Sequence, residues 1–193
     1  MAAPTDNEII RQVLEGEERR YALLVDRYKD RAMTLALRIL ANREEAEEAV
    51  QDAFVRAFRS LGRFRGDSEF STWLYRILHN VAISTLRRRG KLTQVSYDDD
   101  VGIDLEEPPE ADGGLLAGVE QRQMMALVEE ALTELPERYR IVVSFFYIQE
   151  MKYDEIAAVL DVPMGTVKTL LFRGRESLRR AIAARLQHEV STL

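Results

Sequence analysis

Residues 44–61 read EEAEEAVQDAFVRAFRSL, and this stretch carries the cleanest helical period in the chain. Its apolar side chains recur every three or four residues, which places them on one face of an α-helix and leaves the acidic and amide side chains on the other. The apolar positions are Ala46, Ala49, Val50, Ala53, Phe54, Ala57, Phe58 and Leu61. The sequence therefore predicts an amphipathic helix with an apolar inner face and an anionic outer face.

Helices are also predicted on both sides of this stretch, and no segment alternates as a strand would. Thr5 with Glu8, and Asn42 with Glu45, have the spacing of helix N-caps. Further helices are expected over about 17–40, 71–89, 120–135, 136–148, 153–160 and 163–186. The expected fold class is all-α.

The helical pattern stops between residues 91 and 119, and the charge changes there as well. Residues 92–120 hold 9 acidic side chains and no basic ones, together with two adjacent prolines and several glycines. This composition is typical of an extended linker. We therefore expect two small helical domains, residues 1–90 and 120–193, joined by an acidic flexible linker over 91–119.

Composition excludes several classes of protein. Of the 193 residues 46% are hydrophobic and 31% charged, which is typical of a soluble globular chain. No apolar run approaches the roughly 18–20 residues that span a bilayer, and the N-terminus does not read as a signal peptide, so we expect a cytoplasmic protein without membrane insertion. The absence of cysteine excludes disulfides and thiolate metal sites. With two distant histidines and no phosphate-binding glycine loop, we expect no catalytic site, metal or cofactor.

The end of the chain has the pattern of a helix-turn-helix. Ile156, Ala157 and Leu160 are expected to face inward, and Gly165 to permit tight packing. Met164 to Arg185 holds six basic side chains against Glu176 alone, although the whole chain carries a net charge of -6. Such a basic second helix suits the major groove of DNA, although a helical hairpin with a solvated basic face fits the spacing too.

A second candidate surface is the stretch 64–89, FRGDSEFSTWLYRILHNVAISTLRRR, in which aromatic and basic side chains are interleaved. Aromatic faces stack on unpaired bases while arginines bind phosphates. Trp73 shares a helical face with Ile77 and Val81, so it fits a core position equally well. The anionic face of the helix over 44–61 is unsuited to DNA, and solubility alone accounts for it at this point.

Three motifs in register resemble extracytoplasmic-function sigma factors of the sigma-70 family. Residues 47–54 (EEAVQDAF) resemble their region 2.2, and FRGD at 64–67 with FSTWLYRI at 70–77 resembles regions 2.3 and 2.4. LPE at 135–137, YDEIA at 153–157 and GTVK at 165–168 resemble region 4. The resemblance implies a sigma region 2 bundle and a sigma region 4 helix-turn-helix that direct core RNA polymerase to promoter DNA, commonly in a stress response.

The resemblance also assigns roles to individual side chains. Those expected to dock on core RNA polymerase are Glu48, Gln51 and Asp52. Those expected to contact opened minus-10 DNA are Phe64, Arg65, Ser68, Phe70, Trp73, Tyr75, Arg76 and Asn80. Those expected to contact the minus-35 duplex are Lys168, Thr169, Phe172, Arg173 and Arg175. An anti-sigma factor is a further expected partner.

The chain departs from the family pattern at two places. Phe145-Phe146-Tyr147 stands where relatives often carry an arginine, and Leu170 replaces an arginine found in some of them. Both departures bear on which promoter sequence is read. The alternative is a helix-turn-helix regulator that acts without core polymerase, but it leaves the anionic helix and the aromatic loop unexplained.

Overall fold

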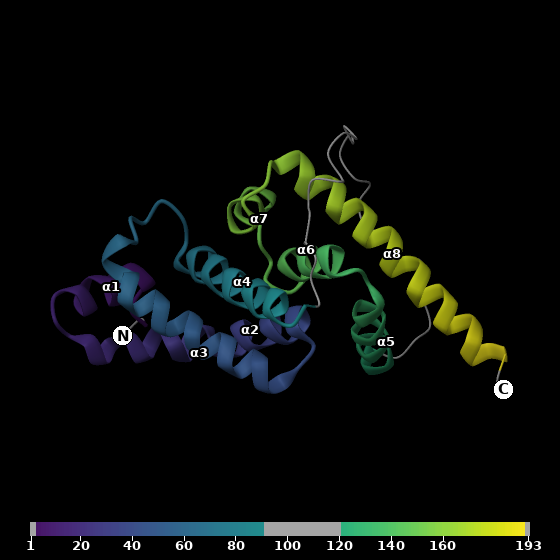
Figure 1. The fold of residues 1–193 in the computed structure, drawn as a ribbon, viewed down its shortest axis with the longest axis horizontal. Coiled ribbons are helices and arrows are strands. Elements are labelled where there is room, and N and C mark those ends of the chain that lie inside the picture. Colours follow the sequence, from purple (N-terminus) through teal and green to yellow (C-terminus); the bar gives the residue numbers. More distant parts are fainter. Residues whose placement is uncertain (1–2, 91–120, 192–193) are drawn as a thin grey trace.

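The computed structural model describes residues 3–90 and 121–191, and within these ranges every regular element is a helix (Figure 1). The elements are α1 (Asp6–Leu14), η1 (Glu18–Arg20), α2 (Tyr21–Leu40), α3 (Arg43–Ser60), η2 (Leu61–Arg63), α4 (Phe70–Arg88), α5 (Gln121–Glu134), α6 (Glu137–Tyr147), α7 (Tyr153–Leu160) and α8 (Met164–Ser191). Side chains are described over 3–90 and 127–187. The linker expected over 91–119 lies outside the described residues.

Both predicted N-caps are confirmed. The Thr5 hydroxyl accepts the Glu8 N–H at 3.3 Å, and the Glu8 carboxylate accepts the Thr5 N–H at 2.8 Å. The Asn42 side-chain oxygen accepts the Glu45 N–H at 3.0 Å. These bonds satisfy amide groups that a helix start leaves without acceptors, so α1 and α3 begin where the sequence predicts.

The apolar stripe of α3 lies at the centre of the first half of the chain. Ala46, Ala53 and Ala57 are at most 1% exposed, and their small side chains let α3 approach α2 and α4 closely. Phe58 differs, because it is 36% exposed and its ring packs against Tyr21 with 5.0 Å between the centroids. The predicted stripe is therefore buried except at Phe58.

The second half is organised along α8, which runs past α7, α6 and α5 as one long helix (Figure 1). Asp161 ends α7 in the left-handed conformation, with a φ of 59°. Pro163 then precedes α8, and its carbonyl accepts N–H groups of Thr166 and Val167 at 3.0 and 3.3 Å. The predicted helix-turn-helix is present, and α8 extends to Ser191, beyond its expected end near Leu186.

The glycine that permits close helix packing is Gly174, whereas the sequence pointed to Gly165. A Cβ added at Gly174 would lie 2.7 Å from a methyl group of Val143 on α6. A Cβ added at Gly165 would meet nothing within 4 Å. The prediction for Gly165 is wrong because the crossing of α6 and α8 lies two to three turns further along α8.

The two halves of the chain pack directly against each other. Helix α4 lies against α7, and α2 lies against α6 (Figure 1). One buried apolar cluster contains side chains of both halves, among them Leu78 of α4 and Phe145 of α6. Part of α4, a helix that the sequence assigns to DNA, therefore faces the second half.

Candidate polymerase and nucleic-acid interfaces

The outer face of α3 carries the side chains expected to dock on core polymerase. Glu48 and Gln51 are exposed, and Asp52 is partly exposed. The Asp52 carboxylate forms an i,i+4 ion pair with Arg56 at 2.8 Å. Val55, one turn beyond Gln51, is 45% exposed, and sequence reasoning missed it. The signal was available, because Val55 is an apolar residue off the apolar stripe.

Three aromatic rings support the loop between η2 and α4. Phe64, Phe70 and Trp73 contact one another with centroid distances of 5.3 to 5.9 Å. Phe70 is 1% exposed, whereas Phe64 and Trp73 are half-buried. Phe70 therefore anchors the loop in the core, while Phe64 and Trp73 stay partly exposed to solvent. Trp73 both packs against the other two rings and remains partly accessible.

Tyr75 is also buried, at 2% exposure. Burial raises the pKa of its hydroxyl to about 12. Tyr75 is buried because α2, α3 and α7 pack around α4. Direct contact of Phe70 or Tyr75 with DNA, which the sequence predicted, does not follow from these positions; in this structure both side chains pack.

The polar minus-10 candidates lie at the surface. Arg65 and Ser68 are exposed on the loop, and Arg76 and Asn80 are exposed on α4. The separation of four residues between Arg76 and Asn80 places them one turn apart on one helical face. The structure thus brings these two together, and neither fills a core position.

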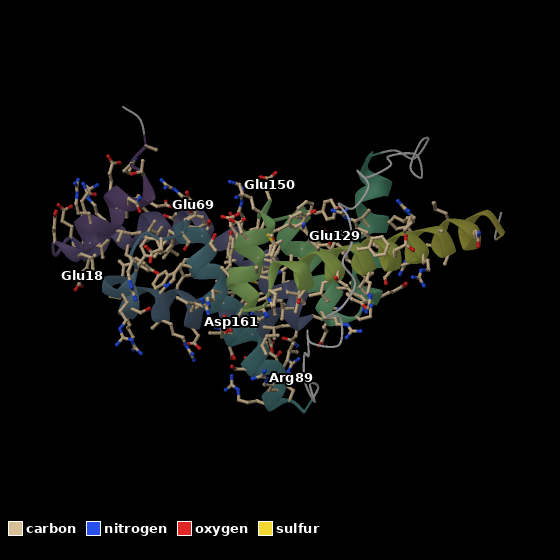
Figure 2. All side chains as sticks on the ribbon, turned by 90° about the horizontal axis from the view of Figure 1, so that it is seen from above. Glu18, Glu69, Arg89, Glu129, Glu150 and Asp161 are labelled. Carbon is tan, nitrogen blue, oxygen red and sulfur yellow. The ribbon has the colours of Figure 1, made fainter. Side chains whose placement is uncertain are left out.

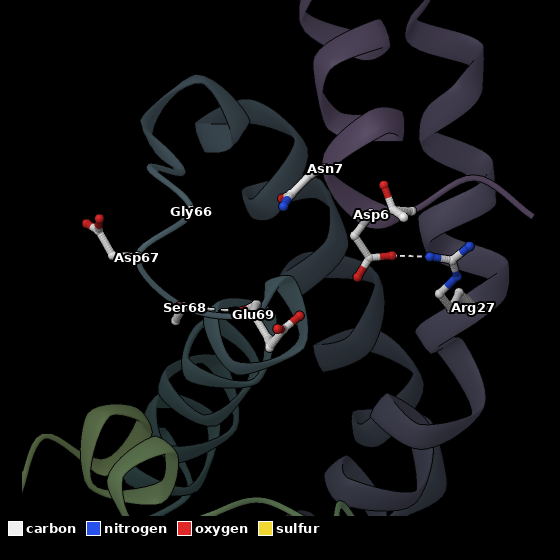
Figure 3. Close-up of a pocket in the computed structure, with 8 residues that line it drawn as sticks. Asp6, Asn7, Arg27, Gly66, Asp67, Ser68 and Glu69 are labelled. Carbon is white, nitrogen blue, oxygen red and sulfur yellow. Dashed lines mark hydrogen bonds and ion pairs between the residues drawn. The ribbon is translucent and has the colours of Figure 1, made fainter.

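A polar cavity of about 470 Å³ lies between the start of α1, α2 and the loop before α4 (Figure 3). Asp6 lines the cavity and forms an ion pair with Arg27 of α2. Ser68 and Glu69 line the loop side, while Asp67 points away from Asp6. The cavity therefore borders the loop that carries the minus-10 candidates, and α1, which the sequence did not connect with this site, forms its other wall.

Two polar contacts connect the candidate minus-10 face of α4 to the helix-turn-helix. The Thr72 hydroxyl donates to one Glu155 oxygen at 3.0 Å, while the other Glu155 oxygen accepts the Lys152 N–H at 2.8 Å. An Arg76 guanidinium nitrogen lies 3.4 Å from an oxygen of Asp161, the residue that ends α7 and is labelled in Figure 2. The ion pair engages one nitrogen of a side chain that stays 48% exposed, so Arg76 keeps further donors accessible beside it.

A buried histidine lies at the contact between the two halves. His79 is 6% exposed, and its ring centroid lies 6.4 Å from that of Phe145 on α6. Its pKa is lowered to about 4, chiefly by burial; a hydrogen bond with the Asn80 side chain opposes this shift, and the charge of Arg87 adds to it. His79 is therefore neutral at pH 7 and occupies a site that disfavours the charged ring.

The outer face of α8 differs in part from the sequence expectation. Lys168, Phe172 and Arg173 are partly exposed, as a DNA-reading face requires. Thr169 is 2% exposed, and its hydroxyl donates to the Gly165 carbonyl at 3.1 Å. Base contact by Thr169 was predicted from its place in the motif; in this structure its hydroxyl is turned to its own helix.

Arg175 lies over two aromatic rings of α6. Its guanidinium carbon is 5.4 Å from the ring centroid of Phe146 and 5.6 Å from that of Tyr147. Phe146 also stacks on Tyr153 at 5.3 Å. In the aromatic triplet at 145–147 only Phe145 is fully buried, and Tyr147 is 45% exposed. Sequence reasoning noted this triplet as a departure from the family and did not connect it with Arg175.

Within the described ranges, His, Asp and Glu side chains form no group of three that could hold a metal ion. No helix in those ranges is both long and apolar enough to cross a membrane.

Comparison with protein families gives two matches. The family described as sigma-70 region 2 matches residues 24–92, and the family described as sigma-70, region 4 matches residues 125–178. The first match covers α2 to α4, and the second covers the helix-turn-helix. Each falls on one half of the described structure.

Curated proteins are similar over nearly the whole chain. The ECF RNA polymerase sigma factor SigW of Bacillus subtilis is 37% identical over 178 residues, which is 90% of this chain and 94% of that protein. The RNA polymerase sigma-H factor of Pseudomonas aeruginosa is 35% identical, with 92% and 93% covered. The ECF RNA polymerase sigma-E factor of Escherichia coli K12 is 34% identical, with 90% and 92% covered.

Solved structures share the fold. CnrH, in complex with the cytosolic domain of CnrY, superimposes with a TM-score of 0.64 at 24% identity, covering 91% of this chain and 96% of that one. The sigma factor RpoE of Bartonella quintana, in complex with the anti-sigma factor NepR, gives a TM-score of 0.63 at 23% identity, covering 84% and 96%.

Proposed function

This chain belongs to the extracytoplasmic-function sigma factors of the sigma-70 family, and from that membership we propose how its surfaces divide the work of transcription initiation. As a sigma factor it binds core RNA polymerase and directs transcription to specific promoters. The observation that carries the assignment of surfaces is that one chain combines an anionic outer face on α3 with exposed arginines on α4 and on α8.

The outer face of α3 is the proposed docking surface for core polymerase. Glu48, Gln51 and Asp52 present acceptors and negative charge to a basic partner. Val55 adds exposed apolar area beside them, which suits the centre of a protein interface. This role explains why a DNA-binding protein carries an anionic helix at its surface.

Helix α4 and the preceding loop are the proposed reader of opened minus-10 DNA. Flipping a base out of the stack costs a few kcal/mol, and stacking on aromatic side chains offsets part of that. Phe64 and Trp73 supply partly exposed rings, and Arg76 and Asn80 supply hydrogen-bonding groups. The cavity beside Ser68 supports this proposal, since a flipped base needs a recess next to the loop.

Helix α8 is the proposed reader of the minus-35 duplex. Lys168, Phe172 and Arg173 lie within its first three turns, and the start of a recognition helix is the part that contacts base edges. With α3 and α4 assigned to the first domain (1–90) and α8 to the second (120–193), each domain binds a different element of the promoter complex.

We further propose that the protein performs no chemistry of its own and works in the cytoplasm with the polymerase, without a cofactor. An anti-sigma factor is part of this proposal, because Bartonella RpoE is bound to one in its solved structure. A helix-turn-helix regulator acting without polymerase is not favoured, since the whole-length relatives are sigma factors.

The proposed division of surfaces is tested by pull-down with core polymerase and by promoter binding of the holoenzyme. Arg173→Ala is expected to weaken binding to the preferred promoter by about 1–3 kcal/mol, the usual scale for a base-reading side chain. The matched measurement uses a duplex of arbitrary sequence, on which the loss is expected to be much smaller. Equal losses on both duplexes would show that Arg173 touches only phosphate.

A further inference from the structure

The guanidinium of Arg175 is held by aromatic rings and not by an acid. It lies over Phe146 and Tyr147, at 5.4 and 5.6 Å from their centroids, and these two rings meet edge to face at 4.9 Å. Two faces that converge on one cation restrict where that cation can move, because the attraction depends on its position over each ring.

The charge of Arg175 has no counter-ion among the described residues. The nearest acid in sequence, Glu176, lies 3.6 Å from Arg179 instead. The Nε atom of Arg175 is buried without a partner, whereas neither terminal nitrogen is buried in this way. Arg175 is partly exposed, so its guanidinium presents a positive charge that no described acid neutralises to whatever approaches this face of α8.

The position of Arg175 along α8 indicates what approaches it. Arg175 follows Lys168 by seven residues, so the two lie on nearly the same helical face, about 10 Å apart along the axis. The major groove is about 12 Å wide. If Lys168 lies inside the groove, Arg175 lies where the helix leaves it, beside the phosphates that border the groove.

We propose that Phe146 and Tyr147 are positioning residues that hold Arg175 as a clamp on a DNA phosphate at the edge of the minus-35 site. This inference rests on the proposed minus-35 role of α8 and refines it: Arg175 fixes the depth and register of the helix and reads no base. Phosphate contacts position a protein on DNA and carry no sequence information.

The test is a double-mutant cycle in the holoenzyme, with affinity for a duplex of arbitrary sequence measured over a range of salt concentrations. Arg175→Ala is expected to reduce the slope of log affinity against log salt by about 0.9, the value for one phosphate. Tyr147→Leu keeps apolar volume but removes a ring, and is expected to weaken binding by about two- to fivefold, the scale of an exposed cation–π contact. Tyr147→Phe keeps the ring and is expected to bind as wild type.

The cycle separates a positioning role from a merely structural one. In the Arg175→Ala background, Tyr147→Leu is expected to have no further effect, since the cation it positions is gone. An additive effect, or an unchanged salt slope in Arg175→Ala, would overturn the proposal. Arg173→Ala serves as the separate check on the minus-35 role: if it abolishes promoter preference while Arg175→Ala has no effect, only the clamp is wrong, and if neither has any effect, the assignment of α8 itself fails.

Discussion

At Gly174 a single added carbon decides how closely α8 can approach α6. A Cβ there would lie 2.7 Å from a methyl group of Val143, which is 2% exposed and β-branched, so it has little freedom to move aside. Gly174→Ala is therefore expected to destabilise the protein by about 1–3 kcal/mol, the scale of overpacking in a core. Thermal or urea unfolding measures it.

Gly165→Ala is the matched control on the same helix. Its added Cβ would meet nothing within 4 Å, and alanine favours helix by about 0.5–1 kcal/mol over glycine in a helix interior, so stability is expected to stay level or rise slightly. A loss at Gly165 equal to that at Gly174 would show that the crossing with α6 is not the cause, because helix propensity alone favours alanine at both positions.

Asn80 offers a second prediction at the residue scale. It is exposed on α4, and its amide can both donate to and accept from the edge of an unpaired base. Asn80→Ala loses a hydrogen bond with His79, so a small drop in the melting temperature is expected. Core binding is expected to stay nearly unchanged while formation of the open complex falls, as measured by permanganate footprinting of the minus-10 region. A pre-melted bubble is expected to restore activity only in part, because the missing contact is to the base. A destabilised variant that opens promoters normally would contradict the base-reading role.

At the scale of the element, the buried face of α3 packs in the core, and its exposed face carries the proposed docking residues. Gln51 and Asp52 lie off the buried stripe, so Gln51→Ala with Asp52→Ala opens no cavity. The double variant is expected to keep its helix content and melting temperature but to lose association with core polymerase, as measured by pull-down. Glu15→Ala removes one negative charge from an exposed position at the end of α1 and is expected to bind normally. Holoenzyme assembly at normal affinity by the double variant would rule out this docking surface.

The helices could be predicted from sequence because their causes are local. The period of α3, the caps at Thr5 and Asn42, and the turn before α8 all depend on residues within a few positions of one another. The burial of Thr169 and Tyr75 depends instead on how helices cross. One residue on a helix is a rotation of about 100°, so a small change in the packing of α8 decides whether position 169 faces solvent. Helical periodicity also could not predict that Arg175 of α8 lies over Phe146 and Tyr147 of α6, because that contact depends on how the two helices cross.

At the scale of the whole molecule, the contact between the halves contains a histidine, whose pKa differs between the folded protein and the unfolded chain. His79 has an unfolded pKa of about 6.5, and in the folded protein burial lowers it to about 4. Above pH 6.5 both states are neutral and stability is complete. As pH falls from about 6.5 to about 4, only the unfolded state takes up the proton, so stability is lost over that window, by about 3 kcal/mol in total, and not further below it.

His79→Leu replaces the imidazole by an apolar side chain of similar size that does not titrate, and it is expected to remove this part of the pH dependence of stability. Unfolding of both proteins by urea at several pH values between about 7.5 and 4 isolates the contribution of His79 from that of the carboxylates. Parallel profiles for wild type and His79→Leu would mean that His79 is protonated as readily in the folded protein as in the unfolded chain.

The pairing of Thr72 with Glu155 and of Arg76 with Asp161 also constrains how this protein evolves. Arg76 contacts α7 in this structure and is proposed to contact DNA in the promoter complex, so two requirements restrict which residue can stand at position 76. Asp161, its partner on α7, is restricted with it. Arg76 is proposed to act as a cation at the minus-10 element, and a basic side chain at position 161 would repel it. Over related lineages position 161 is therefore expected to stay acidic or neutral and to exclude lysine and arginine, and positions 72 and 155 are expected to change together.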